Sequence, residues 1–565
     1  MRRLKFLLFA FVGITPISQA FCDDYTRQPS FYDSIPVTKK HGVLNFKMIS
    51  DPKVMNPVLA EDKESGSVEG YLWMPLMTLD PETLQFLPAI ATRYSISEDK
   101  KNYTFTLNKN AKWQDGSPVT STDYKFTFDK IMDTKINSAV LRSYLTGISI
   151  EKKGSDTVIF HVKEPRFDTL FQLASFIAIQ KKQFENSLNF NDDPGIMHPI
   201  GNGPYILSNY ERGNKLVFTR NKNWWAYSLP HFKNRYNIDE VVVHIIIDRN
   251  LSYERFMKGD IDEIDFSEEQ WHVKVTGLDK NKFSFLPSQN KKVWALKIEN
   301  KFPKPYYYLG WNEKNPIFNT VKTRTALSYL VDYKKIIEKV TYNLSSQSTS
   351  PFGSLTLNSA PELRQINKMM SFNKKKAMDL LIQDGWNNNG QGQLVKDING
   401  KKIPFIFDLN VPTQSQSGQK IAQIIKEDFK SSGITLNIKI LEWNSFLDKI
   451  EKRNFDAVIL GWTSTIFPNP KQTWDTNSQQ EGGSNFIGYS NPRVDALIAK
   501  ANLEFDPLKR NLLMQEINRL IYADQPYTFL IEPKYVLEGL NTKIKSPKWL
   551  SQYEGGAAFD LFYLD

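Results

Sequence analysis

A single cysteine is present in the 565 residues of this chain, so no internal disulfide bond can form and stability must come from buried apolar cores. The six histidines lie far apart and form no His-x-x-x-His pair, the spacing of a helical zinc site. Beyond the first 20 residues, no stretch approaches the roughly 20 apolar residues that a membrane-spanning helix needs. The composition, 41% hydrophobic and 13% aromatic, allows large cores in more than one domain or lobe.

Sequence motifs of common catalytic sites are missing as well. The chain has no Gly-x-Ser-x-Gly elbow, no Cys-x-x-Cys pair and no Walker loop, and the glycine-rich stretch at 482–486 lacks the lysine and the spacing of a phosphate cradle. Spaced carboxylates are abundant in a chain of this length, so a glycosidase-type pair stays open from the sequence alone. We expect a binding protein without a metal or cofactor, and we treat the enzyme as the weaker alternative.

The charge pattern does not indicate a nucleic-acid partner. Lysine and arginine number 72 against 62 acidic residues, a formal net charge of +10. The basic residues are scattered, and short runs such as 374–376 and 401–402 are typical of solvated helix and turn positions. We therefore expect no binding to nucleic acid.

The first 20 residues have the pattern of a secretory signal peptide. Three basic residues among the first five precede an apolar run at 6–14, and small residues at the −3 and −1 positions lead to cleavage after Ala20. We expect export to the periplasm. A lipid anchor on Cys22 is the alternative, but the bulky Phe21 before it fits a lipobox poorly.

The stretch from Ile403 to Pro470 predicts three strands joined by two helices. Strands are expected at 403–411, 434–440 and 455–460, and helices at 421–429 and 443–450, from the change between alternating and three-to-four-residue apolar spacing. A β-α-β-α-β order returns the chain in the same direction each time, which predicts parallel strands. Ligands bind beyond the carboxyl ends of such strands.

Two tryptophans follow these predicted strands. Glu442-Trp443 comes after the second strand, and Gly461-Trp462-Thr463-Ser464-Thr465 comes after the third. On their own, both tryptophans would be interpreted as core anchors. Together with the surrounding Glu-Trp-x-x-Phe-Leu, Phe-Asp-Ala, Gly-Trp and Pro-x-Pro elements, however, the stretch resembles the second lobe of bacterial extracellular solute-binding proteins of family 5, the peptide receptors of ABC importers.

Three motifs earlier in the chain carry the same resemblance. Residues 113–120 read Trp-Gln-Asp-Gly-Ser-Pro-Val-Thr, a tight turn that leads into a helix capped by Thr120. Residues 201–205 and 220–225 resemble the Gly-x-Gly-Pro-Tyr and Arg-Asn-x-x-Trp-Trp elements of the family. We interpret the first motif as structural and the glycines of the second as a turn. The resemblance extends from about Val43 to Leu540.

The resemblance implies an α/β fold, a two-lobed periplasmic binding-protein clamp of the large type II peptide-binding class, with an extra subdomain in the first lobe. The expected division is a signal peptide at 1–20, lobe I at 21–300, lobe II at 301–526 and a return to lobe I at 527–565. Lobe II is expected to begin with a strand followed by one long helix from Val321 to Val340.

The resemblance also implies what the clamp does. A monomeric receptor would capture a peptide or peptide-like ligand between its lobes and deliver it to the permease membrane subunits of an ABC transporter. Two alternatives stay open from the sequence: a receptor that signals to a membrane protein, and an importer receptor for another solute such as a nickel chelate, haem or a sugar.

Six residues are predicted to contact the ligand, and they are Glu61, Trp443, Gly461, Trp462, Thr463 and Thr465. The tryptophans would form aromatic walls, and Glu61 follows a proline turn that approaches the ligand in the family. Typical peptide receptors carry an aspartate at the position of Thr465, where it pairs with the terminal ammonium of the peptide. Because a hydroxyl carries no charge, we expect either a ligand modified at its amino end or a displaced acidic group such as Glu61.

Overall fold

The computed structural model describes residues 30–32, 35, 36, 38, 40–60, 62–275, 283–288, 291–354, 356–365, 367–463, 465–480 and 483–564, with the backbone alone at 283–288, 291 and 292. The predicted signal peptide, Cys22, Glu61 and Ser464 lie outside these residues. Among the residues described, no helix has both the length and the apolar character needed to cross a bilayer.

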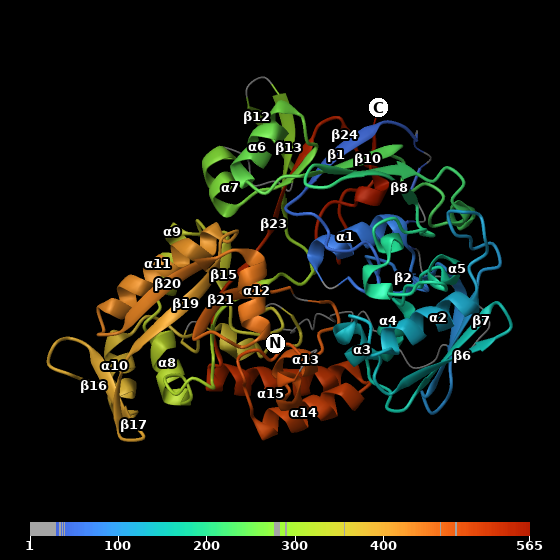
Figure 1. Cartoon of the computed structure of the whole chain (residues 1–565). Coiled ribbons are helices and arrows are strands. Elements are labelled where there is room, and N and C mark those ends of the chain that lie inside the picture. Colours follow the sequence, from blue (N-terminus) through green and yellow to red (C-terminus); the bar gives the residue numbers. More distant parts are fainter. Residues whose placement is uncertain are drawn as a thin grey trace, which may run out of the picture.

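The chain forms two lobes that lie side by side (Figure 1). We use lobe I for residues 30–298 and 536–564, and lobe II for residues 306–533. The predicted two-lobed α/β clamp is confirmed. Lobe I includes both ends of the described chain, because β23 (Val536–Asn541) pairs with β11 (Glu263–Asp265) and β13 (Lys291–Ile298).

Lobe II is built on a sheet with the order β15-β22-β14-β21-β19-β20. The predicted β-α-β-α-β unit is present as β19 (Ile406–Pro412), α11 (Gln416–Lys430), β20 (Thr435–Leu441), α12 (Trp443–Glu451) and β21 (Ala457–Trp462). As expected, β19 is parallel to both β20 and β21. The other half of the sheet is antiparallel and consists of β14 (Tyr306–Trp311), β22 (Tyr527–Pro533) and β15 (Ser345–Gln347).

Two predictions for lobe II were wrong in detail. The single helix expected from Val321 to Val340 is divided into α8 (Val321–Tyr329) and α9 (Tyr333–Lys339), because the Asp332 side chain accepts a hydrogen bond from the Lys335 N–H and starts a second helix. The segment after residue 526 was expected to return to lobe I. Its first strand, β22, instead pairs with β14 and β15 in lobe II, so the chain crosses only after Pro533.

The remaining elements of lobe II surround this sheet. They are α10 (Lys374–Gln383), β16 (Asn387–Asn388), β17 (Leu394–Ile398), β18 (Lys401–Pro404), α13 (Lys471–Trp474), α14 (Pro492–Leu503) and α15 (Pro507–Asp524). Strands β16 to β18 form a small antiparallel sheet at the edge of the lobe.

Three four-stranded sheets form most of the described part of lobe I. Their orders are β1-β10-β9-β8, β4-β5-β7-β6 and β11-β23-β13-β12. The strands not yet named are β1 (Val43–Met48), β10 (Glu240–Ile245), β9 (Lys215–Arg220), β8 (Tyr205–Glu211), β4 (Ala91–Ile96), β5 (Asn102–Leu107), β7 (Thr157–Val162), β6 (Ile148–Lys153), β12 (Phe283–Ser288), β2 (Met77–Leu79), β3 (Phe86–Pro88), β24 (Ile544–Lys545) and β25 (Tyr563–Leu564). The helices are α1 (Lys63–Leu72), α2 (Ser121–Met132), α3 (Ala139–Leu145), α4 (Thr169–Ala174), α5 (Lys181–Phe184), α6 (Arg249–Lys258) and α7 (Glu268–Lys274).

Helix α1 is held at its C-terminal end by the glycine motif at 201–205. The Leu72 carbonyl accepts hydrogen bonds from the N–H groups of Asn202 and Gly203 at 3.0 and 2.8 Å. The side chain of Asn202, which is fully buried, accepts a third hydrogen bond from the Met74 N–H at 2.8 Å. A Cβ atom on Gly203 would lie 2.6 Å from the Leu72 carbonyl carbon, so only glycine permits this approach.

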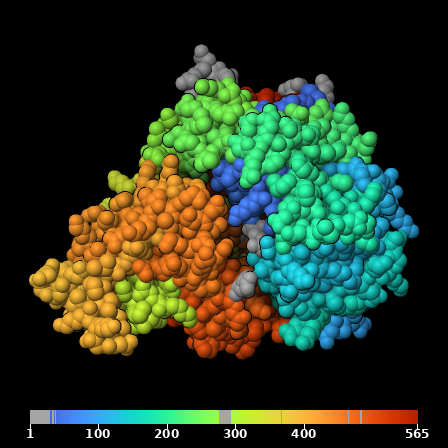
Figure 2. All heavy atoms as spheres, in the orientation of Figure 1, coloured from blue at the N-terminus to red at the C-terminus, as the bar shows by residue number. Residues whose placement is uncertain are grey.

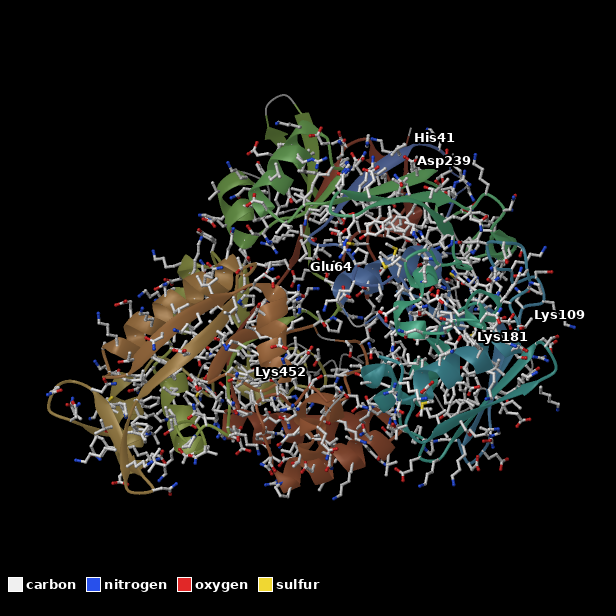
Figure 3. All side chains as sticks on the ribbon, in the orientation of Figure 1. His41, Glu64, Lys109, Lys181, Asp239 and Lys452 are labelled. Carbon is white, nitrogen blue, oxygen red and sulfur yellow. The ribbon has the colours of Figure 1, made fainter. Side chains whose placement is uncertain are left out.

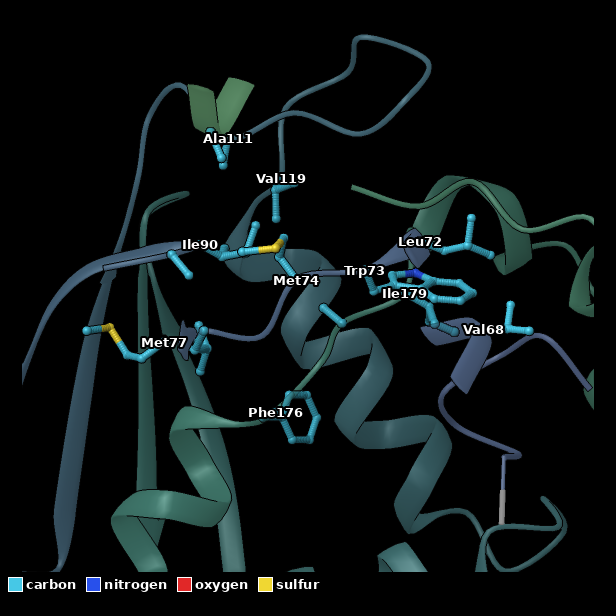
Figure 4. Close-up of a cluster of buried hydrophobic side chains, with 14 of the residues drawn as sticks. Val68, Leu72, Trp73, Met74, Met77, Ile90, Ala111, Val119, Phe176 and Ile179 are labelled. Carbon is cyan, nitrogen blue, oxygen red and sulfur yellow. The ribbon is translucent and has the colours of Figure 1, made fainter. Parts of the chain in front are cut away.

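The three motifs of the first half converge on this point. Gln114 exchanges backbone and side-chain hydrogen bonds with Gly201, and the indole N–H groups of Trp224 and Trp225 both donate to the Asn202 carbonyl. Val68 and Leu72 of α1 are buried in the same core of lobe I as Phe176 and Ile179 (Figure 4). The motifs are therefore structural, and they fix the position of α1.

We predict that Gly203→Ala lowers the free energy of unfolding by about 1 to 3 kcal/mol, since the new methyl group must displace the end of α1. Gly66→Ala is the matched control, because a Cβ atom at Gly66 has no neighbour within 4 Å and alanine favours the helix. Urea unfolding followed by circular dichroism compares the two variants. Equal stability of both would contradict the close approach at Gly203.

A cleft between the lobes

A cavity of about 570 Å³ lies between the two lobes and is lined by residues of both. Lobe I contributes α1, α3 and α4 with the segment after α4, and lobe II contributes the end of β21, Thr463, Thr465, the segment 467–470 and α13. In Figure 2 the orange residues of lobe II face the blue and cyan residues of lobe I along this boundary. The volume is typical of a ligand-binding site.

Aromatic side chains form much of the cavity wall. Those from lobe I are Tyr144, Phe171 and Phe176, and those from lobe II are Tyr306, Phe352, Trp462, Phe467 and Trp474. The indole ring of Trp462 stacks on Phe486, with ring centroids 6.0 Å apart, and its N–H donates to the Tyr527 hydroxyl at 3.3 Å. The contacts with Phe486 and Tyr527 hold the Trp462 ring in one orientation at the cavity wall.

The predicted residues around β21 reach the cavity to different degrees. Trp462, Thr463 and Thr465 line it, and both threonines are exposed. Gly461 does not line the cavity, and a Cβ atom there would lie 2.9 Å from the Tyr307 ring. Close packing against Tyr307 within the sheet therefore explains why residue 461 is a glycine. Whether these residues contact a ligand stays a prediction.

Trp443 is not among the residues that line this cavity, and its predicted contact with a ligand stays a prediction. It is the first residue of α12 and stacks on Phe446 at 5.8 Å between ring centroids, at the edge of a core in lobe II. Glu442 caps the helix, accepting a hydrogen bond from the Asn444 N–H at 2.8 Å. The sequence motif around Trp443 is thus explained by a helix cap and its packing. Glu61, the predicted acidic residue of lobe I, lies outside the described residues.

The two lobes touch along one side of the cavity through α4. The Asp168 carboxylate accepts a hydrogen bond from the Asn469 side chain of lobe II at 2.9 Å, and it also binds Arg166 at 3.3 Å and Gln172 at 2.7 Å within lobe I. The rings of Phe171 and Phe467 pack beside this pair, 5.0 Å apart. Asp168 is only 4% exposed, so its charge is satisfied by these partners rather than by water.

Glu69 is an acidic cavity residue that the sequence did not reveal. It lies in the last turn of α1, directly after the buried Val68, and its side chain lines the cavity from lobe I. Burial, and secondarily the negative charge of Asp62, raises the pKa of Glu69 to about 7. Its place in a short amphipathic helix gave no signal, because only the packing of α1 decides which flank faces lobe II. Glu64, in the first turn of α1, lies in the region between the lobes (Figure 3).

Among the described residues, no group of three or more histidine, cysteine, aspartate or glutamate side chains is arranged to hold a metal ion. The cavity therefore offers aromatic rings, hydroxyl and amide groups and two carboxylates. Such a lining suits a ligand with apolar surface and hydrogen-bonding groups.

A family model for bacterial extracellular solute-binding proteins, family 5 (middle region), matches residues 85–485. The chain belongs to this family. We therefore call it the family 5 protein, a bacterial extracellular solute-binding protein.

Relatives and solved structures agree with this assignment. The oligopeptide-binding protein AppA of Bacillus subtilis is 27% identical over 531 residues, which cover 93% of this chain and 91% of AppA. The structure of that AppA with a nonapeptide has a TM-score of 0.79 at 24% identity and covers 93% of this chain and 99% of that one. NikZ from Campylobacter jejuni in complex with Ni(L-His) has a TM-score of 0.75 at 21% identity, covering 93% of this chain and 100% of that one. The two structures establish the fold.

We predict that Glu69 makes the family 5 protein less stable as the pH rises from 4.5 to 7. In the unfolded chain this carboxyl ionises near pH 4.5, whereas in the folded protein it ionises near 7, so the unfolded state releases a proton that the folded state keeps. Relative to wild type, Glu69→Gln should gain about 1 to 3 kcal/mol of unfolding free energy between pH 4.5 and pH 8. Urea titrations at both pH values measure this gain. A constant difference between the two proteins would contradict the raised pKa.

Proposed function

We propose that the family 5 protein captures oligopeptides between its two lobes and delivers them to the membrane permease of an ABC import system. The observation that carries this proposal is the cavity, because residues of both lobes line it and a ligand inside it would touch both. Its volume and aromatic lining suit a chain of varied side chains, which aromatic surface accommodates by area. The similarity to an oligopeptide-binding protein over 93% of the chain supports the same ligand class.

The proposed cycle uses the two crossings between lobes. The chain passes from lobe I to lobe II between β13 and β14 and returns between β22 and β23. Two such crossings permit a hinge rotation in which the ligand bridges the lobes and favours the closed form. The permease would then recognise the closed form.

The remaining parts of the proposal concern the cell. The protein acts as a monomer, is exported by a signal peptide at 1–20 and is free in the periplasm rather than anchored through Cys22. It binds neither a cofactor nor nucleic acid, and it releases its ligand unchanged. Hydrolysis of the ligand during incubation would identify an enzyme instead.

The direct test is to purify the protein from a bacterial periplasm, release its ligand with acid and identify the ligand by mass spectrometry. We expect a mixture of short peptides at up to one equivalent per protein molecule, recovered intact after prolonged incubation. A nickel chelate, haem or a sugar as the sole ligand would contradict the proposal.

We predict that Trp462→Ala weakens binding of a recovered peptide by about 1 to 3 kcal/mol, because the ring lines the cavity and is held by Phe486 and Tyr527. Trp443→Ala is the matched control, since it removes an equal ring outside the cavity. Titration calorimetry on both variants, after circular dichroism has shown that they fold, gives the affinities. Unchanged affinity in Trp462→Ala, or an equal loss in Trp443→Ala, would show that the peptide binds elsewhere.

A further inference from the structure

The described charged residues that line the cavity are all acidic. Among its described lining residues, the charged side chains are Glu69 and Asp168, and none is lysine, arginine or histidine. The surrounding wall is largely apolar, so the field of an ionised carboxylate is weakly screened there. These residues offer no counter-ion to a negatively charged group of a ligand, whereas they offer two carboxylates to a positively charged group.

Asp168 is already paired. Arg166 supplies an ion pair at 3.3 Å, and the amide groups of Gln172 and Asn469 donate at 2.7 and 2.9 Å. Its carboxylate is 4% exposed and joins the lobes. Three donors from both lobes already satisfy the Asp168 carboxylate and leave it almost unexposed, so we assign it to the contact between the lobes.

Glu69 has no such partner within the described part of the chain. Among these residues, no side chain or backbone group donates a hydrogen bond to its carboxylate, and no cation lies within ion-pair distance. It also lies in the last turn of α1, where the partial negative charge of the helix end disfavours a carboxylate. A partly buried carboxylate without a counter-ion lowers stability, and such a group in a cavity is typical of a ligand-binding site.

We propose that Glu69 binds a positively charged group of the ligand. The cavity would therefore select ligands that carry a cation at this point, and it would not require a negatively charged group on the ligand. For a peptide, the group is the terminal ammonium. This inference rests on the proposed function, and it moves the cation-binding carboxylate to lobe I from the lobe II position occupied here by Thr465.

The placement on α1 also links recognition to closure. Glu69 belongs to lobe I, and Trp462 and Thr465 belong to lobe II. A peptide whose ammonium pairs with Glu69 and whose chain packs on Trp462 therefore contacts both lobes at once and favours the closed form. The three motifs that hold the end of α1 set where this carboxylate lies relative to lobe II.

The test uses two pools of random nonapeptides, both lacking lysine, arginine and histidine and both amidated at the carboxyl end. One pool has free amino ends and the other is acetylated. Wild type, Glu69→Gln and Glu64→Gln, each stripped of ligand, are mixed with both pools near pH 8, where Glu69 is ionised. Mass spectrometry after gel filtration gives the ratio of free to acetylated peptide bound.

We expect wild type to enrich the free-amine pool by about tenfold to a hundredfold, the difference made by one charge-assisted hydrogen-bonded pair. Glu69→Gln should bring this ratio to within about twofold of one, because the amide keeps the shape of the side chain and loses the charge. Glu64→Gln should keep the wild-type ratio, since it removes the same charge from the same helix outside the cavity lining.

Four results would overturn the inference. Equal binding of both pools by wild type does so without any variant, and an unchanged preference in Glu69→Gln assigns the cation to another group. Loss of the preference in Glu64→Gln as well would indicate that the overall negative charge of α1, rather than a contact with Glu69, causes the preference. Failure of wild type to bind either pool removes the proposed function itself and the inference with it, whereas the other three results leave peptide binding intact.

Discussion

The close approach of the 201–203 backbone to the end of α1 is the constraint on which the cleft of this protein depends. One carbonyl, that of Leu72, accepts two backbone hydrogen bonds, and a fully buried asparagine side chain accepts a third from Met74. These bonds require a glycine at position 203, because a side chain there would occupy the space of the helix end. Because Val68 and Leu72 are buried in the core of lobe I, the flank of α1 that carries Glu69 faces the cavity. The position of the carboxylate in the cleft follows from packing that is remote from any ligand.

The two carboxylates of the cavity illustrate two ways in which a folded protein treats a buried charge. Asp168 is surrounded by donors from both lobes, and its charge helps to hold the lobes together. Glu69 has no donor among the described residues, and burial raises its pKa because ionising it there is unfavourable. Removing a charge from water without a counter-ion is unfavourable, and a cationic ligand reverses this cost when it enters. The same residue therefore lowers the stability of the free protein and contributes to affinity.

Much of the fold could be predicted because its signals are local. Alternating apolar residues identified β20, glycine and proline marked the turns, and the β-α-β-α-β order required parallel pairing of β19 with β20 and β21. Other features depend on competition between local and distant contacts. Asp332 divided a long helical pattern by capping a second helix, and β22 joined lobe II because β14 and β15 offered it partners there. An apolar strand pattern carries no information about which sheet accepts the strand.

The two-lobed solute-binding clamp and a cavity wall at the end of β21 were predictable, because short motifs and strand order consist of consecutive residues. Which side chains share the cavity depends on how distant parts of the chain pack together. Trp443 follows β20 and Trp462 ends β21, two strands that are consecutive in the chain, yet the first packs on its own helix and the second lines the cleft. Glu69 shares that cleft with Thr465 although 396 positions separate them in the chain. The orientation of a side chain around a helix, and the face that one lobe turns to the other, are set by contacts between distant residues, which no local pattern encodes.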